Sequence, residues 1–321
     1  MTETTWEVAE PRKLTFDTPL TALDIRVVNG TVNVVGTDEG SPRLEVSHIE
    51  GPPLVITRTG SSLTVSYADL SWKGWLRWLD RKGWHREVTV SLAVPTRTRV
   101  RVGVVGAGAV ISGIQGATSV QSVDGDATLV RISGEVQAET VSGDLEAQSL
   151  SGGLRYNSVS GHLTVIEGAP DASFRADSIS GDMLVDLADG GGAARPADIA
   201  LSTVSGEIAI RLPGSADATV EVDTTGGSVS NAFTALRVSD EWGTKRIRGR
   251  LGPGAGTLKA TTMSGSVALL RGPGRSEDDG ADADGGTDGD GRDGGDASEV
   301  PTVPAPPTDP ADPADLSGKV L

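Results

Sequence analysis

A glycine recurs every nine residues in the middle of this chain, at Gly116, Gly125, Gly134, Gly143, Gly152 and Gly161. The residues around it repeat as well, in the order apolar, Ser or Asp, Gly, polar, apolar, polar, apolar. A complete copy is Val141-Ser142-Gly143-Asp144-Leu145-Glu146-Ala147. The two apolar positions after each glycine are separated by one polar residue, which is the period of a half-buried β-strand. The repeat therefore predicts a series of short strands.

The Ser-Gly pair predicts a tight corner between these strands. Glycine reaches positive φ without a Cβ clash, and Ser or Asp bonds to its own nearby backbone. We expect the apolar residue before the pair to point inward. A strand this short cannot bury its own apolar face, whereas stacked copies share a continuous core. An all-β fold, a parallel β-solenoid, is therefore favoured over an antiparallel meander of tight hairpins, with two or three copies to each coil.

Further copies of the repeat follow the regular array, with insertions between them. The copies are Ile179-Ser180-Gly181-Asp182-Met183, Val204-Ser205-Gly206-Glu207-Ile208 and Met263-Ser264-Gly265-Ser266-Val267. The insertions, 188–196 and 231–256, are either a binding face or neutral loops. Before the array, alternation predicts strands at 23–27, 28–34, 43–49, 54–57, 63–67, 88–92 and 100–104. We predict N-terminal strands over 1–95, packed on or continuous with a solenoid over 96–271, and a tail over 272–321.

Residues 71–86, SWKGWLRWLDRKGWHR, differ from the rest of the chain. Trp72, Trp75, Leu76 and Leu79 fall on one face of a short predicted helix. Its basic residues are Lys73, Arg77, Arg81, Lys82 and Arg86. This Trp-rich insert either caps the solenoid, shielding strand edges, or contacts a protein or an anionic membrane. The predicted contact residues are Trp72, Trp75, Arg77, Trp78, Lys82 and Trp84.

Composition narrows the partners and the compartment. The net charge of −16 argues against nucleic-acid binding, and the absence of cysteine excludes disulfides and thiolate metal sites. The first residues lack the features of a secretory signal, and no run of about 18 apolar residues occurs, so we expect a cytoplasmic protein. Residues 275–299 are rich in Asp and Gly, and residues 300–315 in Pro, Ala and Asp. This composition predicts a disordered acidic tail.

No catalytic, cofactor or metal site is predicted. The three histidines, His48, His85 and His162, have no nucleophile or metal partner near them in sequence and read as surface or turn residues. If coils stack in register, the acidic corner residues form a carboxylate ladder. Polysaccharide-acting β-helix enzymes use clustered acids of this kind, but we favour acids that are simply kept in water. The residues in question are Asp126, Glu135, Asp144, Asp182 and Glu207.

The Ser-Gly repeats over about residues 20–271 resemble those of a bacterial β-strand-repeat family known as "putative adhesin", a domain of unknown function. The strongest carriers are Val141–Leu145, Ile179–Met183 and Val204–Ile208. The resemblance implies a β-helical domain without known catalytic residues, and it suggests surface exposure. We therefore expect a non-enzymatic, adhesin-like binding or scaffold module without a cofactor. Its expected partner is a protein, an anionic membrane surface, or further copies of the chain stacked end to end as in cytoskeletal β-helices; a polysaccharide-acting enzyme is the alternative.

Overall fold

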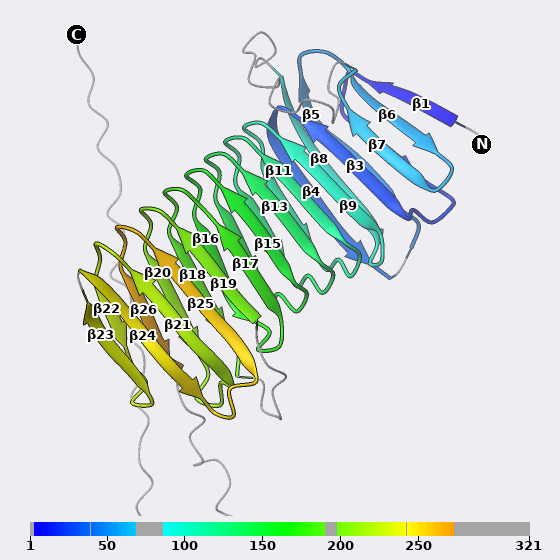
Figure 1. The fold of residues 1–321 in the computed structure, drawn as a ribbon. Coiled ribbons are helices and arrows are strands. Elements are labelled where there is room, and N and C mark those ends of the chain that lie inside the picture. The colour runs from blue at the N-terminus through cyan, green and yellow to red at the C-terminus, as the bar shows by residue number, and fades with distance from the viewer. Residues whose placement is uncertain (1–2, 39, 69–85, 190–197, 242, 273–321) are drawn as a thin grey trace, which may run out of the picture. The chain divides into compact units, whose positions relative to one another are not determined.

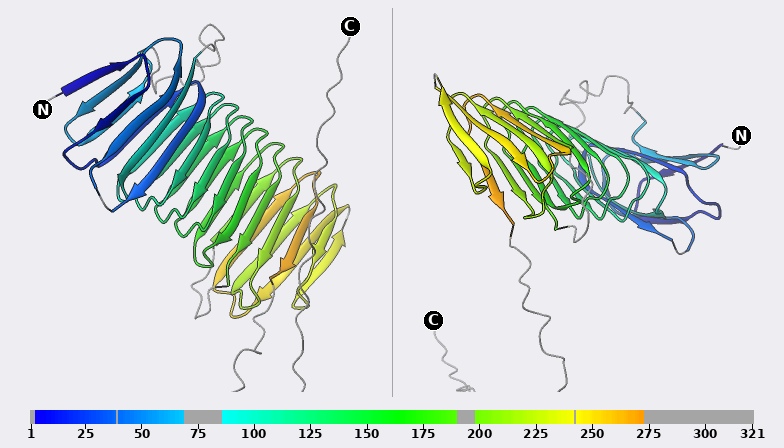
Figure 2. Two further views of the ribbon diagram at one scale, coloured as in Figure 1. Left: turned by 180° about the vertical axis from the view of Figure 1, so that it is seen from behind. Right: turned by 60° about the horizontal axis from the view of Figure 1, so that its bottom comes forward.

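The computed structural model describes residues 3–38, 40–68, 86–189, 198–241 and 243–272. These residues belong to one compact unit, residues 1–275. They form two long β-sheets that face each other across a shared core (Figures 1 and 2). Within the described part of the chain no helix occurs, so none is long and apolar enough to cross a membrane. Residues 71–85 of the predicted helix at 71–86, and residues 273–321 of the predicted tail at 272–321, lie outside the described residues.

The first sheet, sheet A, has 14 strands. In spatial order they are β1 (Glu3–Val8), β6 (Leu54–Thr59), β7 (Ser62–Ser66), β3 (Ala22–Val27), β9 (Arg99–Val104), β11 (Thr118–Ser122), β13 (Val136–Thr140), β15 (Leu154–Ser158), β17 (Ser173–Asp177), β19 (Asp198–Thr203), β25 (Gly256–Thr262), β21 (Ala218–Thr224), β24 (Thr244–Leu251) and β23 (Leu236–Glu241).

The second sheet, sheet B, has 12 strands. In spatial order they are β2 (Arg12–Thr15), β5 (Arg43–Glu50), β8 (Glu87–Pro95), β4 (Asn29–Thr37), β10 (Gly108–Ser112), β12 (Ala127–Val130), β14 (Leu145–Gln148), β16 (Leu163–Gly168), β18 (Met183–Leu187), β20 (Ile208–Leu212), β26 (Val267–Arg271) and β22 (Val229–Asn231).

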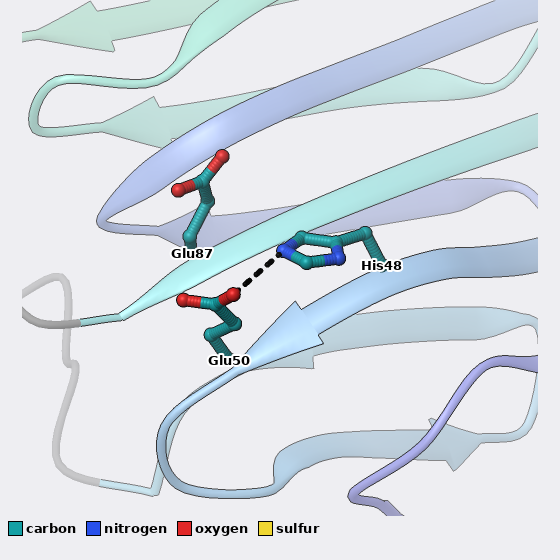
Figure 3. Close-up of side chains that lie close together, drawn as sticks. All are labelled: His48, Glu50 and Glu87. Carbon is teal, nitrogen blue, oxygen red and sulfur yellow. Dashed lines mark ion pairs between the residues drawn. The ribbon is translucent and has the colours of Figure 1, made fainter. Parts of the chain in front are cut away.

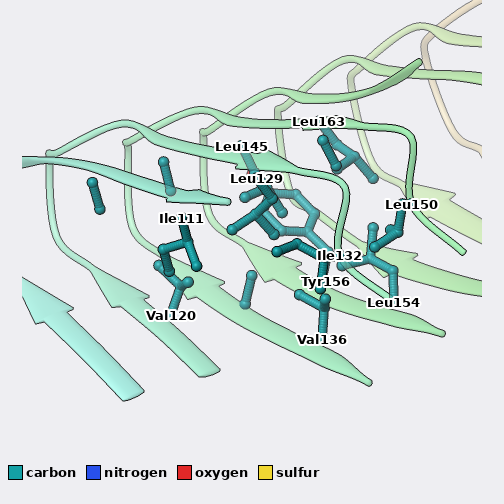
Figure 4. Packing of buried hydrophobic residues seen from close by; sticks show 14 of the residues in the cluster. Ile111, Val120, Leu129, Ile132, Val136, Leu145, Leu150, Leu154, Tyr156 and Leu163 are labelled. Carbon is teal, nitrogen blue, oxygen red and sulfur yellow. The ribbon is translucent and has the colours of Figure 1, made fainter. Parts of the chain in front are cut away.

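Each coil of the array takes two copies of the repeat, one strand in each sheet. Thr118 pairs with Val136 in sheet A and Ala127 with Leu145 in sheet B, both in parallel. Equivalent residues of successive coils therefore lie beside one another, and the inward side chains stack into a continuous core (Figure 4). The parallel β-solenoid is confirmed, and the antiparallel meander is wrong for the array. Two copies close a coil because each copy supplies one strand and one corner.

Both ends of the solenoid depart from this regular winding. At the N-terminal end β1, β6 and β7 pair antiparallel, as do β2, β5 and β8. At the C-terminal end the last coil in sequence, β25 and β26, lies between the coil of β19 and β20 and the coil of β21 and β22. The insertion at 231–256 is not a long loop, because its described residues form the antiparallel pair β23 and β24.

The repeat glycines lie where successive coils touch. A Cβ on Gly143 would lie 2.1 Å from the carbonyl oxygen of Gly125, and a Cβ on Gly161 would lie 2.1 Å from that of Gly143. None of these three glycines has a positive φ. The prediction that the corner glycine supplies positive φ is therefore wrong. Glycine is needed because the backbones of neighbouring coils leave no room for a Cβ.

The hydroxyl that completes this corner is three residues before the glycine rather than beside it. The amide of Gly181 donates to Oγ of Ser178 at 2.9 Å. The serine beside the glycine, Ser180, donates instead to the carbonyl of Val159 in the preceding coil at 3.3 Å. The prediction that this serine bonds to its own nearby backbone is therefore wrong. The hydroxyls equivalent to that of Ser178 belong to Ser122, Thr140, Ser158, Thr203, Thr224 and Thr262.

The apolar residue before the Ser-Gly pair does not point inward in every copy. Ile114, Ile132 and Leu150, on one side of the solenoid, are buried as predicted, and so is Val123 on the opposite side. For the later copies on that opposite side the prediction is wrong, because the corner turns these side chains outward. That side carries an exposed apolar row, in which the exposed fractions are 45% for Val159, 55% for Ile179, 44% for Val204 and 59% for Met263.

Candidate functional site

The predicted contact residues Trp72, Trp75, Arg77, Trp78, Lys82 and Trp84 lie outside the described residues. The two positions that flank their segment are described. Tyr67, just after β7, is buried, and the guanidinium of Arg86, just before β8, lies over its ring at 5.1 Å from the centroid. This cation–π contact joins the chain that leaves sheet A to the chain that enters sheet B.

Both ends of the solenoid core are closed by other residues. At the N-terminal end Trp6 of β1 packs edge-on against the buried Phe16, with ring centroids 5.8 Å apart. At the C-terminal end Phe233, Leu236 and Ile247, on or next to β23 and β24, are buried. The apolar residues of the end strands are thus covered by the chain's own antiparallel strands.

The corner carboxylates stack in register, as the sequence suggested, and their contacts are structural. The amide of Asp144 donates to Oδ1 of Asp126 at 2.9 Å, and the amide of His162 donates to Oδ1 of Asp144 at 2.8 Å. The next amide, of Asp182, donates to Nδ1 of His162 at 3.0 Å. The row ends at Glu207, whose amide donates to Oδ1 of Asp182 at 2.8 Å.

Each acceptor of this corner row therefore caps the backbone of the following coil. His162 replaces a carboxylate in the row and accepts its hydrogen bond through an unprotonated Nδ1. Glu135 is not a member, because it follows Gly134 at the opposite corner, where its carboxylate lies against Gly153. The acidic residues of the row are explained by the backbone amides from which they accept hydrogen bonds. No acid–base pair within the row converges on a position for a substrate.

A second group of titratable side chains was missed by sequence reasoning. His48 and Glu50 of β5 and Glu87 of β8 project from neighbouring strands on one exposed face (Figure 3). Nε2 of His48 lies 3.6 Å from Oε1 of Glu50, and one ligand atom from each of the three residues lies within 4.8 Å of the others. Glu50 and Glu87 are directly opposed in the antiparallel pair. This His–Glu–Glu cluster has the residue types of a metal site.

The strand pairing explains why this cluster exists. Leu44 and Val46 of β5 are buried, so simple alternation would turn His48 and Glu50 inward. A β-bulge between Val46 and His48 shifts the register by one residue. His48 and Glu50 then face solvent, while Ile49 packs against the core. The signal in the sequence is the change of alternation after Val46.

Two continuous sheets with a row of structural corner acids between their strands define a β-solenoid module. Residues 112–194 match the model of the Toastrack DUF4097 family. The resemblance to a β-strand-repeat family of unknown function is thus confirmed over that segment. No curated protein matches the chain in sequence.

Several solved structures are similar to the chain. A "putative adhesin" from Bacteroides fragilis is 11% identical with a TM-score of 0.45, covering 82% of this chain and 98% of that one. A "putative lipid binding protein" from Parabacteroides distasonis is 11% identical with a TM-score of 0.41, covering 82% and 97%. A "putative cell adhesion protein" from Clostridium sporogenes is 10% identical with a TM-score of 0.26, covering 82% and 100%. At these identities and TM-scores none of them transfers a partner to this chain.

Proposed function

We propose that this protein is a non-enzymatic binding module that attaches to an anionic membrane surface through residues 71–86. The observation that carries the proposal is that residues outside this segment pack over both ends of the core. Trp6 and Phe16 do so at one end, and Phe233 and Leu236 at the other. A Trp-rich segment is therefore not needed as a cap, which leaves contact with a partner as the better explanation of its composition.

The charge of the segment favours a membrane over a generic protein partner. Its 16 residues carry five Lys or Arg and a single acid, Asp80, in a chain of net charge −16. Each basic residue near an anionic leaflet contributes about 1 kcal/mol, and tryptophan prefers the interface between lipid and water. Arg86, the last residue of the segment, lies over the ring of Tyr67 on the solenoid. An anionic cytoplasmic leaflet fits this pattern and the expected cytoplasmic location.

Co-sedimentation with phosphatidylserine-containing vesicles tests the proposal. The intact chain is expected to pellet with these vesicles, less so in high salt, and to remain in solution with neutral vesicles. W75A/W78A and R77A/K82A should each reduce binding. R97A/R99A removes the same number of charges from exposed positions of the solenoid and should not. Binding that survives in the first two variants, or that falls equally in the third, contradicts the proposal.

End-to-end self-assembly is a second candidate, favoured by the direction of the edge strands. β1 pairs antiparallel with β6, which pairs antiparallel with β7, so β1 runs in the same direction as the coil strands. β2 does the same through β5 and β8, and β23 does so through β24 and β21. β22 pairs parallel to β26. A translated copy would therefore continue both sheets by parallel pairing, a heterologous contact that forms open filaments. Sedimentation velocity over a concentration series tests this, and a concentration-independent monomer contradicts it.

A further inference from the structure

We propose that His48, Glu50 and Glu87 form a binding site for a borderline divalent cation, of which Zn²⁺ is the representative. The site lies on the exposed face of β5 and β8 (Figure 3). It is independent of the membrane contact proposed above, because its ligands belong to the described strands of sheet B.

Glu50 and Glu87 are directly opposite each other in the antiparallel pair of β5 and β8. Like charges in that position destabilise a sheet. Nε2 of His48 lies 3.6 Å from Oε1 of Glu50, beside this pair. A divalent cation held by the three side chains would lie between the two carboxylates and remove their repulsion.

The β-bulge in β5 changes the face of the strand after Val46, so that His48 and Glu50 are placed beside Glu87 while Ile49 takes the inward position. Without the extra residue the imidazole and the Glu50 carboxylate would enter the core. β-bulges re-aim side chains at functional sites, and here the bulge brings all three ligands to one face.

The distances within the cluster fit a zinc ion. Two ligands of a tetrahedral zinc ion, each about 2.0–2.1 Å from the metal, are about 3.3 Å apart. The separation of 3.6 Å between Nε2 of His48 and Oε1 of Glu50 is close to this value. The other separations, up to 4.8 Å, close by rotation of exposed glutamate side chains. Three protein ligands leave a coordination position for water.

The ligand types select the class of metal. Imidazole nitrogen suits Zn²⁺, Ni²⁺ and Cu²⁺, whereas Ca²⁺ and Mg²⁺ prefer sites made only of oxygen. The corner row offers a comparison within the same protein. There Nδ1 of His162 lies 3.5 Å from Oδ2 of Asp182, but that nitrogen already accepts the amide of Asp182. His162 is therefore the matched control for His48.

Zinc titration of the full chain at pH 7.5, by calorimetry or by competition with a chromophoric zinc indicator, tests the site. We expect one tight site in the parent protein and at least tenfold weaker binding in H48A and in E87Q, with H162N unchanged. The acidic segment at 275–299 is common to all four proteins, so differences between them report on the cluster. A second readout is the melting temperature, which zinc should raise in the parent and H162N only.

Several results would overturn the assignment. They are the absence of tight zinc binding to the parent, full affinity in either H48A or E87Q, and displacement of zinc by millimolar Ca²⁺. The three side chains are exposed, so metal-free H48A and E87Q should melt within a few degrees of the parent. If one variant is instead misfolded, E50Q supplies the same comparison at the third ligand.

Discussion

Gly143 lies directly against Gly125 of the preceding coil, and a Cβ at position 143 would come within 2.1 Å of the Gly125 carbonyl oxygen. Both partners are main chain, so neither can move aside by changing a rotamer. The corner glycines thus set how closely successive coils approach. This close approach permits the ladder bonds of both sheets to form in register.

Gly143→Ala is therefore expected to lower the free energy of unfolding by about 2–4 kcal/mol, because the two coils that carry Gly125 and Gly143 must separate locally. The matched control is Gly153→Ala. Its Cβ would meet only the flexible carboxylate of the exposed Glu135, and we expect a change below about 1 kcal/mol. Thermal and urea melts measure both. Equal losses in the two variants would show that glycine is required for some other reason.

The buried hydroxyl before each corner gives a second prediction. Ser178→Ala leaves the amide of Gly181 without its acceptor and should lower the free energy of unfolding by about 1–3 kcal/mol. Ser178→Thr retains the hydroxyl, and threonine already occupies the equivalent place at Thr203, so this variant should lose much less. Hydrogen exchange of the Gly181 amide, faster in the alanine variant alone, provides a local readout. Equal stability of the two variants contradicts the role.

The corners show which parts of the fold the sequence could predict. Leu145 and Ala147 alternate with polar residues, so the strand was readable from local sequence, and the shared period of the copies made parallel stacking readable too. The number of copies per coil was not readable, because a nine-residue copy looks the same whether two or three close the coil. The position of Ser178 is marked in the sequence by the pattern Ser or Thr, apolar, Ser, Gly, but the pattern does not tell which of its two hydroxyls bonds to the glycine amide.

Other features depend on long-range pairing that no local pattern records. The last coil enters between two earlier ones because β25 pairs with both β19 and β21. The His–Glu–Glu cluster needs the β5–β8 register, in which Glu87 meets Glu50 across a separation of 37 positions in the chain. The stacked acids Asp126 and Asp144 were foreseen as a row, yet their backbone partners could be seen only once the coils were placed side by side.

A column of left-handed residues supplies the third prediction. Arg131, Ser149 and Glu167 have φ of 53°, 54° and 55°, and the equivalent residue one coil earlier is Gly113, with φ of 68°. A side chain in this conformation costs about 1–2 kcal/mol. Arg131→Gly should therefore raise the free energy of unfolding by about 0.5–1 kcal/mol, after the entropy cost of glycine. Glu146→Gly, at an exposed extended position of β14, should lower it. The idea fails if both glycines destabilise alike in urea melts.

Tyr156 is expected to lower the stability of the folded chain at alkaline pH. Its phenol is buried in the core and donates to the carbonyl of His162 at 3.1 Å. Burial raises the pKa of Tyr156 to about 12, with the nearby Asp144 carboxylate adding to the rise and a hydrogen bond to Ser158 opposing it. The unfolded chain releases this proton near pH 10. The stabilisation is therefore fully present below about pH 10 and is lost as the pH rises towards 12, a change of about 2–3 kcal/mol.

Tyr156→Phe separates this effect from the titration of other groups. At pH 8 the variant should be less stable than the parent by about 1 kcal/mol, because the hydrogen bond to His162 is lost. Between pH 10 and 11.5 the parent should lose this advantage, since its phenol ionises more readily in the unfolded chain. Urea melts across this range measure the gap. Absorbance at 295 nm follows the ionisation of the phenols, and the ionisation step near pH 12 that belongs to Tyr156 should be missing in the variant. A gap that stays constant with pH shows that the buried phenol does not lower the stability at alkaline pH.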